Sequence, residues 1–176
     1  MNALNALPPV RRGALGFLLL FSAGLAPASA DASIRFVQQE IRGMDCAPCA
    51  YGMQKSLLKL SGVQNVQVSL NDAMGTLILA PGNDVTFEQI RDVVRDGGFK
   101  PMAATARIAG TLKRDRDLWT LTTQDGRQYR LDVGTSASDR LQALSGARQV
   151  LATVQVPADA EPVGHLRVED VSELTE

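Results

Sequence analysis

The chain has 176 residues, and its 18 Lys and Arg nearly balance its 19 Asp and Glu, for a formal net charge of −1 at neutral pH. Charges of both signs are scattered along the chain, whereas nucleic-acid binding usually needs a concentrated basic stripe, so that class of function is disfavoured. No segment after residue 30 is apolar over the length that a membrane span needs.

The first 30 residues have the features of a signal peptide. Arg11 and Arg12 form a positive region, residues 13–25 are apolar over the length of a signal-peptide core, and residues 28–30 are Ala-Ser-Ala, a small-x-small cleavage pattern. A transmembrane anchor is disfavoured because the apolar stretch is short and ends at that pattern. We expect a mature chain that begins near Asp31, has a net charge of −3 after loss of the two Arg, and resides in the periplasm, where disulfides persist.

The region from Ile34 to Met102 alternates between strand and helix patterns. Met53 and Leu57 lie four residues apart, on one face of a helix, and Thr86 and Gln89 have the spacing of a helix capping box. The expected elements are a strand at 34–41, a helix at 47–60, strands around 66–70 and 75–79, a helix at 86–96 and a strand at 99–105. This order is the split βαβ arrangement, with two helices on one face of a four-stranded antiparallel sheet.

The region from residue 104 to residue 176 is richer in short alternating strands. Residues 124–126, Gln-Asp-Gly, form a hairpin turn signal. The expected elements are strands at 107–113, 118–122 and 128–133, a helix at 136–144, and strands at 149–156 and 165–171. Three strands, a helix and two strands is the order of a small OB-type barrel. The expected fold class is therefore α+β, with a ferredoxin-like domain at 31–103 and an OB-like β-barrel domain at 104–176.

The two cysteines of the chain are three positions apart, in the run from Gly43 to Cys49. Cys46 is expected in the loop after the first strand and Cys49 in the first turn of the helix. Free N–H groups and the helix dipole stabilise thiolates there. Soft thiolates select soft ions such as Cu(I), with Zn(II) and Hg(II) as alternatives, and two ligands do not complete the four-ligand shell of a structural zinc site.

The run Gly-Met-Asp-Cys-Ala-Pro-Cys at residues 43–49 resembles the GMxCxxC signature of heavy-metal-associated domains. These domains occur in copper chaperones, in copper-transporting P-type ATPases and in periplasmic mercury-binding proteins. The resemblance covers about residues 33–103, and it includes the Gly98-Phe99 pair near the expected site and the apolar spacing of the first helix. It implies the ferredoxin-like fold already expected from the element order.

The resemblance also implies roles for single residues. Cys46 and Cys49 would be the metal ligands, Met44 a buried support for the loop, Phe99 a shield over the site, and Lys100 a positive charge that offsets a bis-thiolate complex. Family members pass Cu(I) by sulfur-for-sulfur exchange with a partner that presents a similar Cys motif, such as a membrane metal transporter. The implied role is binding and transfer, without catalysis.

Two other interpretations of the cysteines remain open. Pro48 makes the motif Cys-Ala-Pro-Cys, which is similar to the CxPC active site of thioredoxins and suggests a periplasmic thiol-disulfide oxidoreductase. Against this, only about 15 mature residues precede Cys46, too few for the start of a thioredoxin fold, and the preceding residue is Asp45 and not Trp. A short-loop disulfide without further function is the other alternative.

Residues away from the cysteines have simpler interpretations. His165, the one histidine, is expected to be a partly exposed strand residue and not a metal ligand. Trp119 and Tyr129 are expected in the core or between the domains, although an aromatic patch for stacking nucleobases is the alternative. Ile78 is expected on the outward side of its strand, which suggests that the second domain covers that face of the sheet.

Overall fold

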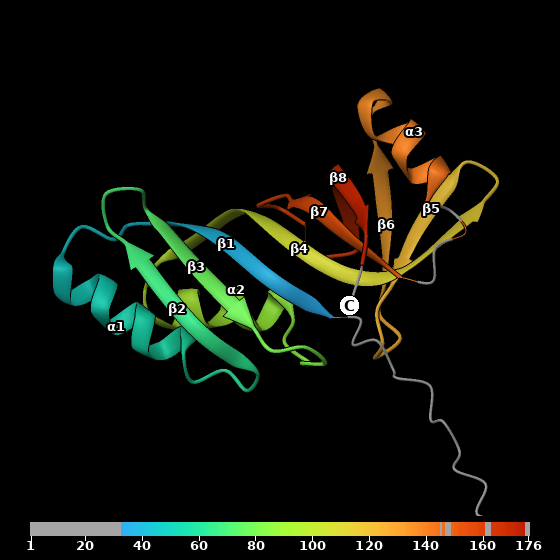
Figure 1. Ribbon diagram of the computed structural model, residues 1–176. Helices are drawn as coiled ribbons and strands as arrows, with labels where there is room; N and C mark the ends of the chain where they lie inside the picture. The colour runs from blue at the N-terminus through green and yellow to red at the C-terminus, as the bar shows by residue number, and fades with distance from the viewer. Residues whose placement is uncertain (1–32, 145, 147–148, 161–162, 175–176) are drawn as a thin grey trace, which may run out of the picture.

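The computed structural model describes residues 33–144, 146, 149–160 and 163–174, so the expected leader at 1–30 lies outside the described residues. The β-α-β-β-α-β order is confirmed in the first part of the chain (Figure 1). Its elements are β1 (Ile34–Arg42), α1 (Ala47–Leu57), β2 (Val63–Ser69), β3 (Met74–Leu79), α2 (Phe87–Asp96) and β4 (Lys100–Asp115). The strands are ordered β2-β3-β1-β4 and all three neighbouring pairs are antiparallel, as in a ferredoxin-like sheet.

The two helices of this part bury the faces that the apolar spacing predicts. Met53 and Leu57 of α1 are buried, but the helix ends at Leu57, three residues before the expected end. Residues 58–60 continue as turns, in which Leu60 N–H donates to the Leu57 carbonyl. The capping box of α2 is confirmed, because the Thr86 side chain accepts from the Gln89 backbone while the Gln89 side chain accepts from the Thr86 backbone.

β4 differs from the expectation of two separate strands at 99–105 and 107–113. It is one strand of 16 residues, and it runs through the expected domain boundary between residues 103 and 104. Ala104, Ala106 and Ile108 are buried in alternation, and the chain has no turn residue there that would end the strand. Gly110 continues the strand, because β4 pairs with the next strand of the chain from Thr111 onward.

The remaining strands pair in a closed ring with the second half of β4. The additional elements are β5 (Leu118–Thr122), β6 (Gln128–Val133), α3 (Thr135–Ala143), β7 (Val150–Val156) and β8 (His165–Glu173). The pairings run β4-β5-β6-β8-β7 and then return from β7 to β4, and only the β6–β8 pair among them is parallel. We call these five strands, with the loops that join them, the ring. Trp119 and Tyr129 are buried among them, so the expectation of a core role for both residues is confirmed.

The ring adjoins the first part of the molecule along β4. β7 pairs with β4 from Ala104 to Gly110, and β1 pairs with residues 100–108 along the other edge of β4. The expectation that the second domain covers the outward face of the sheet is wrong at Ile78, which is 44% exposed. β7 pairs with the edge of β4 instead, because an unpaired strand edge has backbone groups that another strand satisfies. Among the described helices, none has the length and apolar character of a bilayer span.

Candidate metal centre

Cys46 ends the loop between β1 and α1, and Cys49 lies in the first turn of α1, at the end of the molecule opposite the ring (Figure 1). β1 ends at Arg42, and Gly43 then has a φ of +92°, a backbone conformation that residues with a Cβ rarely adopt. Met44 is 8% exposed and belongs to the hydrophobic core, as the resemblance implies. The loop is thus anchored by Met44 while the residues after it turn back toward the helix.

Cys46 is the N-cap residue of α1. Its backbone is extended, with φ −135° and ψ 145°, and its sulfur accepts a hydrogen bond from Cys49 N at 3.2 Å. Pro48 lies in the first turn, where its missing N–H removes no helix hydrogen bond. The sulfur of Cys46 therefore takes the place of the Ser or Asp oxygen that usually caps a helix, and the helix N-terminus favours negative charge there.

The structure shows Cys46 and Cys49 as a disulfide, with 5.2 Å between the two Cα atoms. That separation lies within the usual range for bonded cysteines. Both residues are half-buried, and Cys49 packs against the core. The backbone therefore holds the two sulfurs within bonding reach of each other. Reduction of the disulfide has to precede binding of a metal ion by either thiolate.

Asp45 is a candidate ligand that the sequence analysis missed. Its carboxylate and the two cysteine sulfurs all lie within 4.8 Å of one another, and the Asp45 side chain is exposed. In the described part of the chain, this is the one group of three His, Cys, Asp or Glu residues with such a geometry. Its adjacency to Cys46 was the available signal, although in the sequence Asp45 counted only against a thioredoxin motif.

The structure places the two other predicted residues beside the loop. Phe99 is half-buried, and a Cβ added to Gly43 would lie 3.8 Å from its ring, so Phe99 borders the loop. Lys100 is exposed at the start of β4, and its Cα pairs with that of Arg42, one residue before the loop. His165 lies elsewhere, exposed at the start of β8 in the ring.

Comparison with known proteins agrees with this geometry. Residues 40–100 match the heavy-metal-associated domain family. That segment, which contains the Cys46–Cys49 pair, is therefore a heavy-metal-associated domain. The match begins within β1, spans the cysteine loop, α1, β2, β3 and α2, and ends at the first residue of β4.

Three similar proteins each match little more than a third of the chain. Copper-transporting ATPase 2 of Homo sapiens is 33% identical over 60 residues, which are 34% of this chain and 4% of that protein. The yeast copper transporter domain CCC2A is 28% identical, covers 38% of this chain and 90% of its own, and has a TM-score of 0.36. The N-terminal domain of a potential copper-translocating P-type ATPase from Bacillus subtilis is also 28% identical, with coverages of 39% and 84% and a TM-score of 0.36.

Proposed function

We propose that the reduced protein binds one soft metal ion through Cys46 and Cys49 and transfers it to a partner. The observation that carries this proposal is the pair of sulfurs at the N-terminus of α1 in a heavy-metal-associated domain. Cu(I) is the first candidate, because two thiolates suit a soft ion that accepts two-coordinate geometry. Hg(II) fits the same two sulfurs, and Zn(II) is a further candidate that needs more ligands.

Transfer follows from the exposure of the loop. A two-coordinate ion on half-buried sulfurs leaves room for a thiolate of the partner to bind before Cys46 or Cys49 leaves. The ion then moves through sulfur exchange without a change of oxidation state. The proposed partner is a protein with a similar Cys motif, such as a membrane metal transporter, and no catalysis by this chain is required.

We further propose that the ring is an OB-like barrel and that the protein works in the periplasm. The three strands, helix and two strands of residues 100–173 and the closed pairing pattern support the barrel. The sequence of residues 1–30 supports export through a signal peptide. In an oxidising compartment the carrier would alternate between the disulfide and the metal-binding dithiol, with a thiol reductant as the electron source.

The disulfide favours a second candidate function, that of a thiol-disulfide oxidoreductase. Cys46 and Cys49 are bonded at a helix N-terminus, where the thiolate of a reduced pair is stabilised. This function would need exchange with disulfides of other proteins. Turnover in an insulin-reduction assay is therefore the measurement that separates it from metal transfer.

The test is an anaerobic titration of the reduced protein with Cu(I) and, separately, with Hg(II). We expect about one ion per chain, and loss of that ion in Cys46→Ser and in Cys49→Ser. The oxidised wild-type protein is the matched control, because it has the same residues but no free thiolate. Failure of the reduced protein to retain either ion against a mild chelator would reject metal transfer, and clear insulin reduction would favour the oxidoreductase.

A further inference from the structure

A buried arginine fastens α2 to the ring. Arg91 is 1% exposed, and its guanidinium donates to the carbonyl oxygens of Pro157 at 2.5 Å and Ala160 at 2.7 Å, which follow β7. Burial lowers the pKa of Arg91, while Glu88 and Asp159 favour its charged form. Because a buried guanidinium without acceptors is strongly destabilising, these two carbonyl groups have to stay in place beside the helix.

Two further contacts hold the first turn of α2. The Glu88 carboxylate accepts a hydrogen bond from Val163 N at 2.9 Å, just before β8. The Phe87 ring meets the Tyr129 ring of β6 edge-on, with 6.1 Å between the ring centroids and 71° between the planes. Both aromatic rings are buried. α2 is therefore attached to the ring through an apolar contact as well as through hydrogen bonds.

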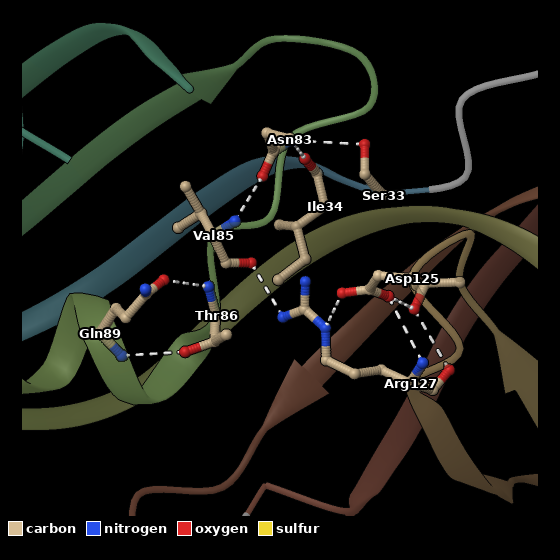
Figure 2. A network of polar contacts seen from close by, with 9 residues as sticks. Ser33, Ile34, Asn83, Val85, Thr86, Gln89, Asp125 and Arg127 are labelled. Atoms are coloured by element: carbon tan, nitrogen blue, oxygen red, sulfur yellow. Dashed lines mark hydrogen bonds and ion pairs between the residues drawn. The ribbon is translucent and has the colours of Figure 1, made fainter. Parts of the chain in front are cut away.

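The segment that leads into α2 is tied to the β5–β6 turn (Figure 2). Arg127 donates from Nη1 to the Val85 carbonyl at 3.1 Å and is ion-paired with Asp125. Val85 N in turn donates to the Asn83 side chain at 3.1 Å, and Asn83 donates to the Ile34 carbonyl at 2.7 Å. The start of α2 is thus held on both sides, by the ring and by β1.

The other end of α2 packs against Phe99, which borders the metal loop. A Cβ added to Gly97 would lie 2.6 Å from Met53 Cε of α1 and 3.2 Å from Phe99 Cδ2, so the end of α2 closely contacts both side chains. Phe99 N donates to the Val94 carbonyl at 3.1 Å, which ties Phe99 to the last turn of the helix. The Phe99 ring lies beside Gly43, at the start of the loop with Cys46 and Cys49.

We propose that the ring restricts the motion of the metal loop through α2, with Arg91 as the positioning residue. We call this restraint the brace, and we call the Phe99 side chain, which α2 holds against the loop, the wall. This inference rests on the proposed metal-binding function and assigns a role to the part of the chain outside the family match. A helix fixed at its first turns by the ring cannot tilt freely at its last turn. The loop then opens less often, and a bound ion leaves more slowly for a small chelator.

The test loads the reduced protein with one equivalent of Cu(I) and measures release to a chromogenic Cu(I) chelator by stopped-flow absorbance. We expect Arg91→Ala to raise the release rate about 5-fold, and Arg91→Lys, which keeps one donor group, to restore part of the wild-type rate. In a Phe99→Ala background, Arg91→Ala should have no further effect, because the wall through which the brace acts is gone. General destabilisation would not produce that dependence on Phe99.

Arg95→Ala is the matched control, since Arg95 lies on the same helix, nearer the loop, and is ion-paired with Asp92 on the exposed side. Its release rate should equal that of the wild type. If Arg91→Ala does not fold, Glu88→Ala removes a single ring contact and should raise the rate about 2-fold. A folded Arg91→Ala or Glu88→Ala variant with wild-type release would overturn the brace, as would an Arg91 effect that persists without Phe99.

Hydrogen exchange separates the brace from the metal-binding proposal. In the metal-free reduced protein, Arg91→Ala should speed amide exchange in residues 43–50 and 97–100 relative to Arg95→Ala. Should the wild type retain no Cu(I) while this exchange effect appears, the brace stands and the proposed function fails. Unchanged exchange in both segments, together with normal metal retention, rejects the brace alone.

Discussion

At the scale of single residues, the site combines sulfur, carboxylate and backbone groups in one short loop. Cys46 caps α1 with its sulfur and is also one of the two candidate metal ligands. A change at this residue therefore affects both the helix end and the binding of metal. Asp45 is exposed and lies beside the two sulfurs without a role in the helix cap, so its substitution tests the metal chemistry more cleanly.

Asp45→Asn is expected to change the preference of the site among metals. A carboxylate oxygen is a suitable ligand for Zn(II) but a poor one for Cu(I). Removing the charge should therefore weaken Zn(II) binding about 10-fold and leave Cu(I) affinity within about 2-fold of the wild type. Competition titrations of the reduced variant against a calibrated chelator for each ion measure both values. Equal losses for the two ions would show that Asp45 acts by general electrostatics.

Tyr129, which contacts α2 from the ring, is expected to make the free energy of unfolding depend on pH above 10. Burial raises the pKa of Tyr129 from 10.0 to about 12, so the folded protein holds the phenol proton more tightly than the unfolded chain. The resulting stability is fully present below pH 10 and is lost as the pH rises toward 12. The loss amounts to ~3 kcal/mol for a shift of this size.

Urea unfolding at pH 9, 10 and 11 in the wild type and in Tyr129→Phe tests this expectation. Tyr129→Phe keeps an aromatic side chain beside Phe87 but has no phenol to titrate. Its free energy of unfolding should fall less steeply over this range than that of the wild type. Parallel pH curves for the two proteins would contradict the assignment of the effect to Tyr129.

At the scale of elements, β4 and α2 determine how the two parts of the chain meet. β4 belongs to the ferredoxin-like sheet through β1 and to the ring through β5 and β7. α2 is part of the heavy-metal-associated domain, yet its first turns contact the ring and its end contacts Phe99, which borders the metal loop. A change in either element is therefore expected to affect both parts.

Gly110 is the point on β4 where the backbone of β5 comes close. A Cβ there would lie 2.8 Å from the Thr122 carbonyl oxygen and 2.9 Å from Leu121 Cδ1. Because a backbone carbonyl in a strand cannot move aside readily, Gly110→Ala should destabilise the protein by about 1–3 kcal/mol. Urea denaturation of Gly110→Ala, with Gly126→Ala as the comparison, measures the change in the free energy of unfolding.

Gly126 is an instructive comparison, because its φ is +84° but no atom lies within 4 Å of an added Cβ. The variant at Gly126 reports backbone strain alone, whereas the variant at Gly110 reports steric contact alone. Wild-type stability in Gly110→Ala would mean that β4 and β5 separate at this point without cost.

At the scale of the whole molecule, the ring protects an edge of the sheet. β4 is the edge strand of the order β2-β3-β1-β4, and β7 covers it from Ala104 to Gly110. β1 also pairs with β4 as far as Ile108. A heavy-metal-associated segment cut at residue 103 therefore loses part of its own β1–β4 ladder as well as its protection by the ring.

Two fragments test the consequence. A fragment of residues 31–103 should unfold at a lower temperature than one of residues 31–110, because the longer one keeps the pairs from Ala104 to Ile108. Both should associate more than the full chain, since the β4 edge is open to another strand. Thermal unfolding followed by circular dichroism and size-exclusion chromatography measure the two effects. A fully stable, monomeric 31–103 fragment would argue that the ring contributes nothing to the fold.

The local patterns of the sequence determined the β-α-β-β-α-β order, the capping box at Thr86 and the location of the cysteines at the start of α1. These features depend on residues a few positions apart, where spacing, turn chemistry and helix capping act directly. The buried position of Met44 followed from the family resemblance, which also concerns a short run of residues. Expectations based on such short distances were confirmed, apart from the ends of elements such as α1.

Only the tertiary structure decided how distant segments meet. Arg91 reads as one charged residue of an amphipathic helix, but its acceptors are 66 and 69 residues away along the chain. The pairing of β7 with β4 likewise depends on which strand bonds to the open backbone groups of the sheet edge. Because the ring joins the sheet at that edge, the face with Ile78 stays exposed. Burial of a charge and pairing of an edge are properties of the partner surface, and that surface exists only once the chain has folded.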